Sequence, residues 1–104
     1  ALQQIDQLEH DSVIRVAVLV ESLETRIASK SQKKFAILMI SDGFDRYELP
    51  IWPEMYEEKG ALLKENQLLY AVVQIDKKEG AARLNCKWFD ELTRINEGMI
   101  DECD

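Results

Sequence analysis

The segment 33–56, KKFAILMISDGFDRYELPIWPEMY, constrains the fold more than any other part of the chain. Residues 33–41 are almost wholly apolar and are followed by Asp42-Gly43, and glycine has the positive φ that hairpin turns require. Residues 47–51 then alternate between two faces, as expected for a second strand. Pro53 suits the first helical position, where its missing N–H costs nothing. The segment therefore predicts two strands joined by a tight turn and running directly into a helix.

Three further stretches have the pattern of strands. Residues 13–25 (VIRVAVLVESLET) are rich in β-branched side chains and apolar on both faces midway, which predicts a long, bent strand with a partner on each side. A helix predicted over 53–64, with Met55, Tyr56, Leu62 and Leu63 as its buried stripe, separates the hairpin from strands at 67–76 and 81–89. In the last strand Ala82, Leu84, Cys86 and Trp88 share one phase.

Five strands with one short helix between the third and fourth predict an all-β OB-fold, a partly open, five-stranded Greek-key barrel. Strand counting alone also admits an SH3-like barrel. Pro50 lacks a ladder donor, so the strand 47–51 should be an edge strand or bulged there. We expect the barrel over 13–92, a short helix or a lightly docking linker over 1–12, and an acidic tail over 93–104.

Composition narrows the possible functions. The chain has 104 residues, enough for one core, and no apolar run approaches the ~18 residues of a membrane span. Two cysteines and one histidine are too few for a disulfide framework, a metal site or a histidine-dependent catalytic triad. We therefore expect a cytoplasmic, non-enzymatic chain with no cofactor and no metal. The chain begins with Ala1 and its methionines are internal, so we expect a piece of a longer protein.

The net charge of −7 is unevenly distributed. Residues 1–12 carry −3 and residues 90–104 carry −5, whereas the middle of the chain carries +1. Between Thr25 and Ser41 there is no acid, and this stretch holds four basic residues, Arg26, Lys30, Lys33 and Lys34. The acidity therefore belongs to the ends, and a basic loop precedes the second predicted strand.

The segments IRVAVLVES, KKFAILMISD, YELPIWPEMYEEKGALLKENQLLYAVVQID and RLNCKWFDEL resemble the OB domain near the C-terminal part of bacterial DNA polymerase III alpha subunits. Residues 48–56 match that family's Glu-Val-hydrophobic-Phe-Pro-Glu-x-Tyr signature, with Trp52 at the phenylalanine position. The resemblance covers about residues 13–92. It implies a DNA-directed DNA polymerase as the parent protein, with the polymerase chemistry outside this chain. Anticodon-binding OB domains of class II tRNA synthetases share the general outline.

Four positions depart from the family pattern. Val18 stands where the family has a glycine that relaxes the bend of the first strand, and Ser41 replaces the first acid of an acidic pair. Asp45 replaces the glycine of the turn, and Pro50 replaces an ordinary strand residue. None of these changes removes the loop that would bind a ligand. The chain is therefore expected to be a divergent member.

The resemblance implies a binding surface on the outer face of the second and third strands, flanked by two loops. If Ala36, Leu38 and Ile40 point into the barrel, Phe35, Ile37 and Met39 point outward, with Phe35 as the candidate for stacking on a base. The first loop would contact phosphates through its four basic residues, the other loop through Lys77 and Lys78. The candidate nucleic-acid-binding residues are Arg26, Lys30, Lys33, Lys34, Phe35, Ile37, Met39, Arg46, Lys77 and Lys78.

Ordinary structural roles compete with each assignment. Basic loop residues are commonly solvated, Lys77 and Lys78 alternate with acids, and an apolar outer face also suits a tail or a neighbouring domain. Trp52 and Trp88 are expected to pack in the core or at its rim, and His10 to be solvated. Acids around the turn at Asp42 suit turn chemistry better than a metal site.

Two functional hypotheses remain from the sequence. The first is a module that binds single-stranded template DNA, weakly in isolation, beside neighbouring domains of a replicative polymerase. The second is an OB-type protein-interaction module, and an anticodon-binding OB domain is a further alternative. The basic loop favours nucleic acid, whereas the acidic total favours a protein partner.

Overall fold

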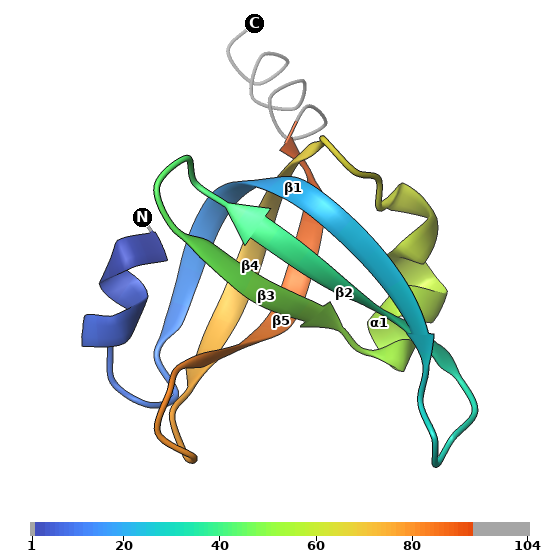
Figure 1. Ribbon diagram of the computed structural model, residues 1–104, viewed down its shortest axis with the longest axis horizontal. Helices are drawn as coiled ribbons and strands as arrows, with labels where there is room; N and C mark the ends of the chain where they lie inside the picture. The colour runs from blue at the N-terminus through green and yellow to red at the C-terminus, as the bar shows by residue number, and fades with distance from the viewer. Residues whose placement is uncertain (1, 93–104) are drawn as a thin grey trace, which may run out of the picture.

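The structure, a computed structural model, describes residues 2–92 and consists of one five-stranded antiparallel barrel with short helices at its two ends (Figure 1). The elements in chain order are η1 (Leu2–Gln7), β1 (Val13–Ile27), β2 (Lys34–Ser41), β3 (Arg46–Ile51), α1 (Pro53–Lys59), η2 (Gly60–Leu62), β4 (Leu68–Asp76) and β5 (Arg83–Glu91). The strand order is β3-β2-β1-β4-β5. This is the predicted OB-fold, with its helix between the third and fourth strands.

The long strand β1 is shared by the two halves of the barrel, as predicted. Its first half pairs with β4, from Val13 opposite Gln74 to Leu19 opposite Leu68. Its second half pairs with β2, from Leu19 opposite Ser41 to Ile27 opposite Lys34. A β-bulge between Val20 and Ser22 lies just beyond the changeover. Bulges increase the local bend and twist of a strand, so β1 can turn from one partner to the other.

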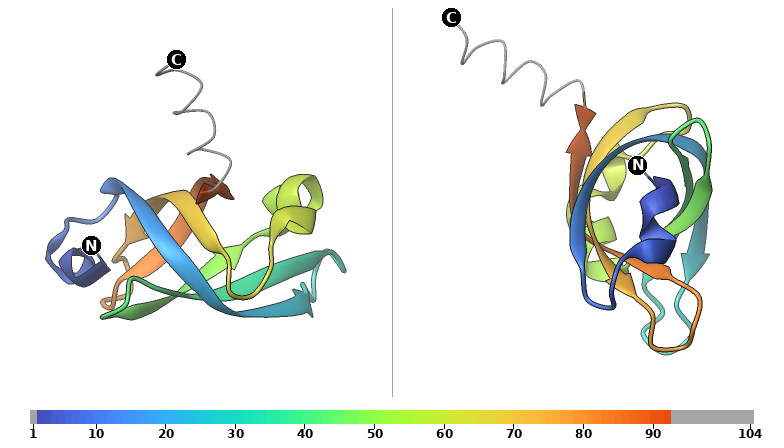
Figure 2. Two further views of the ribbon diagram at one scale, coloured as in Figure 1. Left: turned by 90° about the horizontal axis from the view of Figure 1, so that it is seen from above. Right: turned by 90° about the vertical axis from the view of Figure 1, so that its left-hand side faces the viewer.

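The barrel is partly open between β3 and β5. These strands lie against each other, but the sheet order ends at β3 on one side and at β5 on the other (Figure 2). Pro50 therefore lies on an edge strand, opposite Ile37 of β2. An edge strand forms backbone hydrogen bonds on one side only, so a proline, which has no N–H, is tolerated there. The prediction that the third strand is an edge strand is confirmed.

The core is formed by the inward phase of every strand together with η1. Its fully buried side chains from the strands include Val20, Ala36, Leu38, Ile40, Leu49, Ile51, Leu69, Ala71, Val73, Ile75 and Phe89. Leu2 and Ile5 of η1 are also fully buried, and η1 sits in one opening of the barrel (Figure 2, right). Of the two predicted alternatives, the structure has the short helix and not the lightly docked linker, and its two buried side chains complete the core.

The helix after β3 is shorter than the predicted 53–64. α1 ends at Lys59 and continues as the 3-10 turn η2. At Gly60 a Cβ atom would lie 2.8 Å from Cδ1 of Tyr56, so only glycine permits this close approach of backbone to ring. Of the predicted stripe, Leu63 is buried, whereas Met55, Tyr56 and Leu62 are partly buried against the core.

A second bulge changes the phase of β5. Val73 pairs with Cys86 and Val72 with Trp88, so Lys87 is the extra residue. Phe89 is therefore fully buried, and Trp88 is turned outward and 41% exposed. The prediction that Trp88 continues the phase of Leu84 and Cys86 was wrong, because strict alternation fails at a bulge.

Within residues 2–92, no helix is long and apolar enough to cross a membrane. Nor does this part of the chain bring together three or more His, Cys, Asp or Glu side chains that could hold a metal ion.

Candidate functional site

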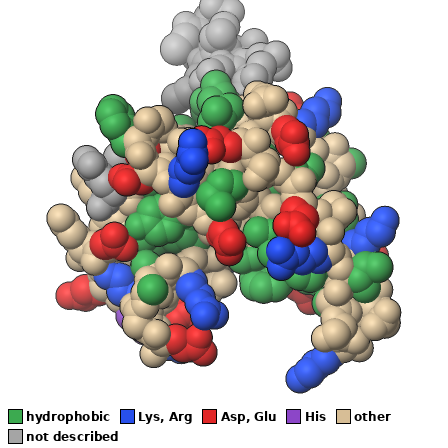
Figure 3. All heavy atoms as spheres, in the orientation of Figure 1, with side chains coloured by type: hydrophobic (Ala, Val, Ile, Leu, Met, Phe, Trp, Pro, Cys, Tyr) green, Lys and Arg blue, Asp and Glu red, His purple; other side chains and the backbone are tan. Residues whose placement is uncertain are grey.

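A groove of about 790 Å³ runs along the outer face of β2 and β3 to the β4–β5 loop. Its lining comes from β2, β3, the residue that follows β3, and the two arms of the β4–β5 hairpin: Ile37, Met39, Arg46, Tyr47, Glu48, Pro50, Trp52, Asp76, Ala82, Arg83, Leu84 and Asn85. Figure 3, in the orientation of Figure 1, shows apolar surface with acidic and basic side chains interspersed. The groove thus has an apolar floor and charged borders.

The floor follows from the alternation of β2. Ala36, Leu38 and Ile40 are fully buried, whereas Phe35, Ile37 and Met39 are partly exposed on the other face. The predicted orientation of this strand is confirmed. Ile37 and Met39 lie directly in the groove, and Phe35 lies beside it.

Trp52 supplies the most accessible aromatic ring at the groove. Its ring stacks on that of Phe35, with centroids 5.4 Å apart and planes at 30°, and the residue is 50% exposed. The two residues meet because Ala36 pairs with Ile51, which places their neighbours side by side on the outer face. Trp52, rather than Phe35, therefore has the freer face for a ligand. The sequence interpretation assigned Trp52 to the core or its rim and not to the binding residues, although Trp52 is in phase with the outward Glu48 and Pro50.

The basic β1–β2 loop lies at the end of the barrel that carries α1. Arg26 donates two hydrogen bonds of 3.1 Å to Glu24, and these bonds hold the pKa of the Glu24 carboxyl below its usual range. Within residues 2–92, no carboxylate lies within 4.0 Å of the ammonium groups of Lys30, Lys33 and Lys34. Lys33 and Lys34 also border a smaller hollow of about 360 Å³ beside Tyr56 of α1. Three lysines thus remain available to an anion.

Arg46 and Arg83 are the basic residues of the groove itself. Arg46 Nε lies 2.9 Å from Glu21 Oε2, and Arg83 pairs with Glu79 at 3.0 Å. Ion pairs of this kind at the surface contribute little free energy, so an anion could displace either carboxylate from its arginine at small cost. Arg83 and Asn85 were not among the predicted residues. Their alternation with the inward Leu84 and Cys86 is the sequence signal for their position.

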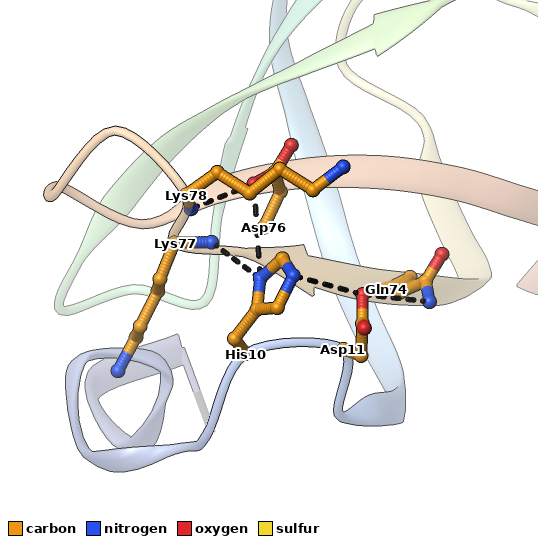
Figure 4. A network of polar contacts seen from close by, with 6 residues as sticks. All are labelled: His10, Asp11, Gln74, Asp76, Lys77 and Lys78. Carbon is orange, nitrogen blue, oxygen red and sulfur yellow. Dashed lines mark hydrogen bonds and ion pairs between the residues drawn. The ribbon is translucent and has the colours of Figure 1, made fainter.

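The β4–β5 loop is attached to the N-terminal segment (Figure 4). Nδ1 of His10 accepts the backbone N–H of Lys77 at 3.0 Å and lies 3.8 Å from Asp76 Oδ1. The ammonium of Lys77 donates to the backbone oxygen of Asp6 at 2.8 Å, so it points toward η1. Lys78 uses its backbone N–H to bind Asp76 Oδ1. His10 is exposed, as expected, and it also holds this loop.

The β2–β3 turn is ordered by Asp42, as expected from turn chemistry. Asp42 Oδ1 accepts the N–H groups of Phe44 and Asp45, both at 2.9 Å, and Oδ2 accepts the N–H of Leu2 at 3.0 Å. These bonds, that of Asp45 first, lower the pKa of the Asp42 carboxyl. Gly43 has φ +96°, which the turn requires, and Phe44 at the tip is 89% exposed.

The chain is similar in sequence to bacterial DNA polymerase III alpha subunits. No protein-family model matches the chain. The chain is 48% identical over 101 residues to the DNA polymerase III subunit alpha of Chlamydia pneumoniae, and 43% identical over 102 residues to that of Chlamydia trachomatis serovar D. These matches cover 97% and 98% of the chain but only 8% of each relative's length.

The fold also matches a solved structure. The replication factor A related protein from Methanobacterium thermoautotrophicum superposes with a TM-score of 0.62 at 17% identity, over 86% of this chain and 89% of that one. At this identity the likeness concerns the fold alone. Together, the sequence relatives and the shared fold confirm the resemblance inferred from the sequence.

Proposed function

Since the chain corresponds to a short segment of the bacterial DNA polymerase III alpha subunits, we propose that it is an OB module that holds single-stranded template DNA. In this role the chain is not itself a catalyst, and nucleotide transfer takes place elsewhere in the parent polymerase. Its other partners are neighbouring domains of that polymerase, and its location is the cytoplasm.

The groove on β2 and β3 is the observation that carries the proposal. Proteins bind single strands with aromatic or apolar platforms for the bases and a positive track for the backbone. Ile37, Met39 and the exposed ring of Trp52 form the platform. Arg46 and Arg83 border it, and the lysines of the β1–β2 loop continue the positive track toward α1.

The electrostatics predict weak binding by this chain alone. The net charge is −7, and both groove arginines are already paired with carboxylates. Each phosphate contact formed on a single strand should add about −0.7 to the slope of log K against log salt. We expect two to four such contacts, chiefly from the three lysines of the β1–β2 loop, and hence a slope of about −1.5 to −3.

Fluorescence anisotropy with labelled oligothymidine at two salt concentrations tests the proposal. The matched control is duplex DNA of the same length, whose bases cannot stack on Trp52, and oligouridine as competitor tests the preference for DNA over RNA. We expect single strands to bind more tightly than the duplex, with affinity falling as salt rises. Absence of binding at low salt, or binding indifferent to salt, would refute the proposal.

One observation favours a protein-interaction module as the second candidate. Phe44 is 89% exposed at the tip of a turn that Asp42 holds in place, and Asp45 follows it directly. Rigid, exposed aromatic residues are typical anchors at protein interfaces. Phe44→Ala should leave DNA binding unchanged. If Phe44→Ala instead weakens association with the remainder of the parent polymerase, measured by calorimetry, the interaction role is supported.

A further inference from the structure

The two walls of the groove are connected through a single residue that does not line it. Asp6 of η1 accepts the hydroxyl of Tyr47, in the β3 wall, on its Oδ1 atom at 3.1 Å. The backbone oxygen of the same residue accepts the ammonium of Lys77, in the β4–β5 loop, at 2.8 Å. Asp6 therefore lies between the wall formed by β3 and the wall formed by the loop.

Neighbouring contacts strengthen the attachment to the loop side. His10 accepts the backbone N–H of Lys77, and Asp11 accepts a hydrogen bond of 3.4 Å from Nε2 of Gln74 (Figure 4). The backbone N–H of Asp11 donates to the oxygen of Ile75, and that of Ile75 donates to the oxygen of Ser12, both at 2.8 Å. The N-terminal segment thus follows the last residues of β4 up to the loop.

The connection on the β3 side has a firm base. Tyr47 is partly buried against the core, and Leu2 and Ile5 fix η1 in the barrel opening. Burial and the Asp6 carboxylate raise the pKa of Tyr47, so its hydroxyl keeps the proton that it donates. The hydrogen bond between Tyr47 and Asp6 therefore joins two elements, β3 and η1, that are both packed against the core.

We propose that the segment 2–12 sets the width of the groove, with Asp6, Tyr47 and His10 as positioning residues that keep the β4–β5 loop facing β3. The part of this inference that concerns DNA affinity rests on the proposed function, whereas the part that concerns the two walls does not. A preformed groove spares the ligand the cost of ordering the loop, which increases affinity without adding a contact.

The test places the change in one wall and the readout in the other. Tyr47→Phe removes one hydroxyl and no charge, and amide hydrogen exchange measured by NMR follows the N–H groups of Lys77, Lys78 and Gly80 across the groove. We expect these amides to exchange about two- to tenfold faster, as after the loss of one hydrogen bond. Tyr70→Phe is the matched control, since Tyr70 faces outward on β4, edge-on to Trp88.

A second pair of variants acts through η1. Asp6→Ala should accelerate exchange in the same loop amides, whereas Glu9→Ala removes the same charge from an exposed position and should not. Thermal unfolding of each variant verifies that it is folded. The Tyr47→Phe variant should also bind oligothymidine about two- to fivefold more weakly, with an unchanged salt slope, because no phosphate contact is lost.

The outcomes separate the two claims. Unchanged exchange in Tyr47→Phe, or equal acceleration in Tyr70→Phe, overturns the proposal that the walls are coupled. Faster exchange with unchanged DNA affinity overturns the role in binding. If the parent chain binds no DNA and exchange still accelerates, the coupling of the walls stands and the proposed function fails.

Discussion

Trp52→Ala should reduce both the stability and the DNA affinity of the domain, for separable reasons. A fully buried tryptophan removes up to ~250 Å² from water, so the half of Trp52 that is covered by Phe35 and its surroundings corresponds to roughly 100 Å². At about 25 cal/mol per Å² this is an upper bound of ~2.5 kcal/mol, and a more compact unfolded state lowers it. We expect a loss of about 1–2 kcal/mol in the free energy of unfolding.

The exposed half of the ring determines the effect on binding. Stacking of a base on an aromatic side chain contributes ~1–3 kcal/mol, so the Kd for oligothymidine should rise roughly 5- to 150-fold. Phe35→Ala should weaken binding less, since the Phe35 ring supports the Trp52 ring by stacking on it and is not the ring on which we expect the base to stack. Because its ring is partly buried, that variant should also cost about 1 kcal/mol of stability, more than expected for an exposed position.

Trp88→Ala is the control for this experiment. Trp88 is 41% exposed, lies edge-on to Tyr70 with centroids 6.4 Å apart, and has the ammonium of Lys59 4.6 Å from its ring centroid. Its loss should cost similar stability, but it does not line the groove and should not change the Kd. Urea unfolding and anisotropy titration measure the two quantities. Equal loss of affinity in both variants, or none in Trp52→Ala, would refute the role of Trp52.

Three further predictions concern the loop, η1 and the thiol. Changing Lys30, Lys33 and Lys34 together to Ala should make the salt slope of DNA binding shallower by up to about 2 units in the anisotropy titration; an unchanged slope would exclude these lysines from phosphate contact. Ile5→Ala should lower the free energy of unfolding by about 2–5 kcal/mol in urea, because Ile5 is fully buried, and a cost near zero would show that η1 is dispensable. Burial raises the pKa of Cys86 to about 11, so at pH 8 its alkylation, followed by peptide mass, should be about two orders of magnitude slower in the folded than in the unfolded chain. Comparable rates would mean that the thiol is accessible.

The strands and the inward face of β2 were predictable because alternation and turn residues are local properties of the sequence. Asp42-Gly43 marks the turn of the hairpin and Pro53 marks the start of the helix that follows it, and the structure has both at these positions. The two bulges were harder to predict, because a residue is extra only in relation to the strand with which its own strand pairs. Lys87 shows this: nothing in RLNCKWF indicates that the phase changes, and the change becomes visible only when Val72 and Val73 are placed opposite.

The candidate site was predicted in part for the same reason. Ile37, Met39 and Arg46 belong to adjacent strands, so their proximity follows from the hairpin. The bonds of Lys77 and His10 join residues 67 or more positions apart, and a short polar segment gives no sign of such a partner. Whether the ten predicted residues bind DNA stays a prediction.

The position of β1 at the centre of the sheet has a consequence for how the chain folds. Its second half pairs with β2, the next strand in the sequence, whereas its first half pairs with β4, some fifty to sixty residues later. Local pairing forms early and distant pairing late, so the β1–β2–β3 meander should form before β4 closes the barrel. During synthesis, Val16 and Val18 would remain on an unpaired strand edge until β4 has left the ribosome. Such edges are prone to aggregation, which makes the interval between β3 and β4 the vulnerable stage in the production of this domain.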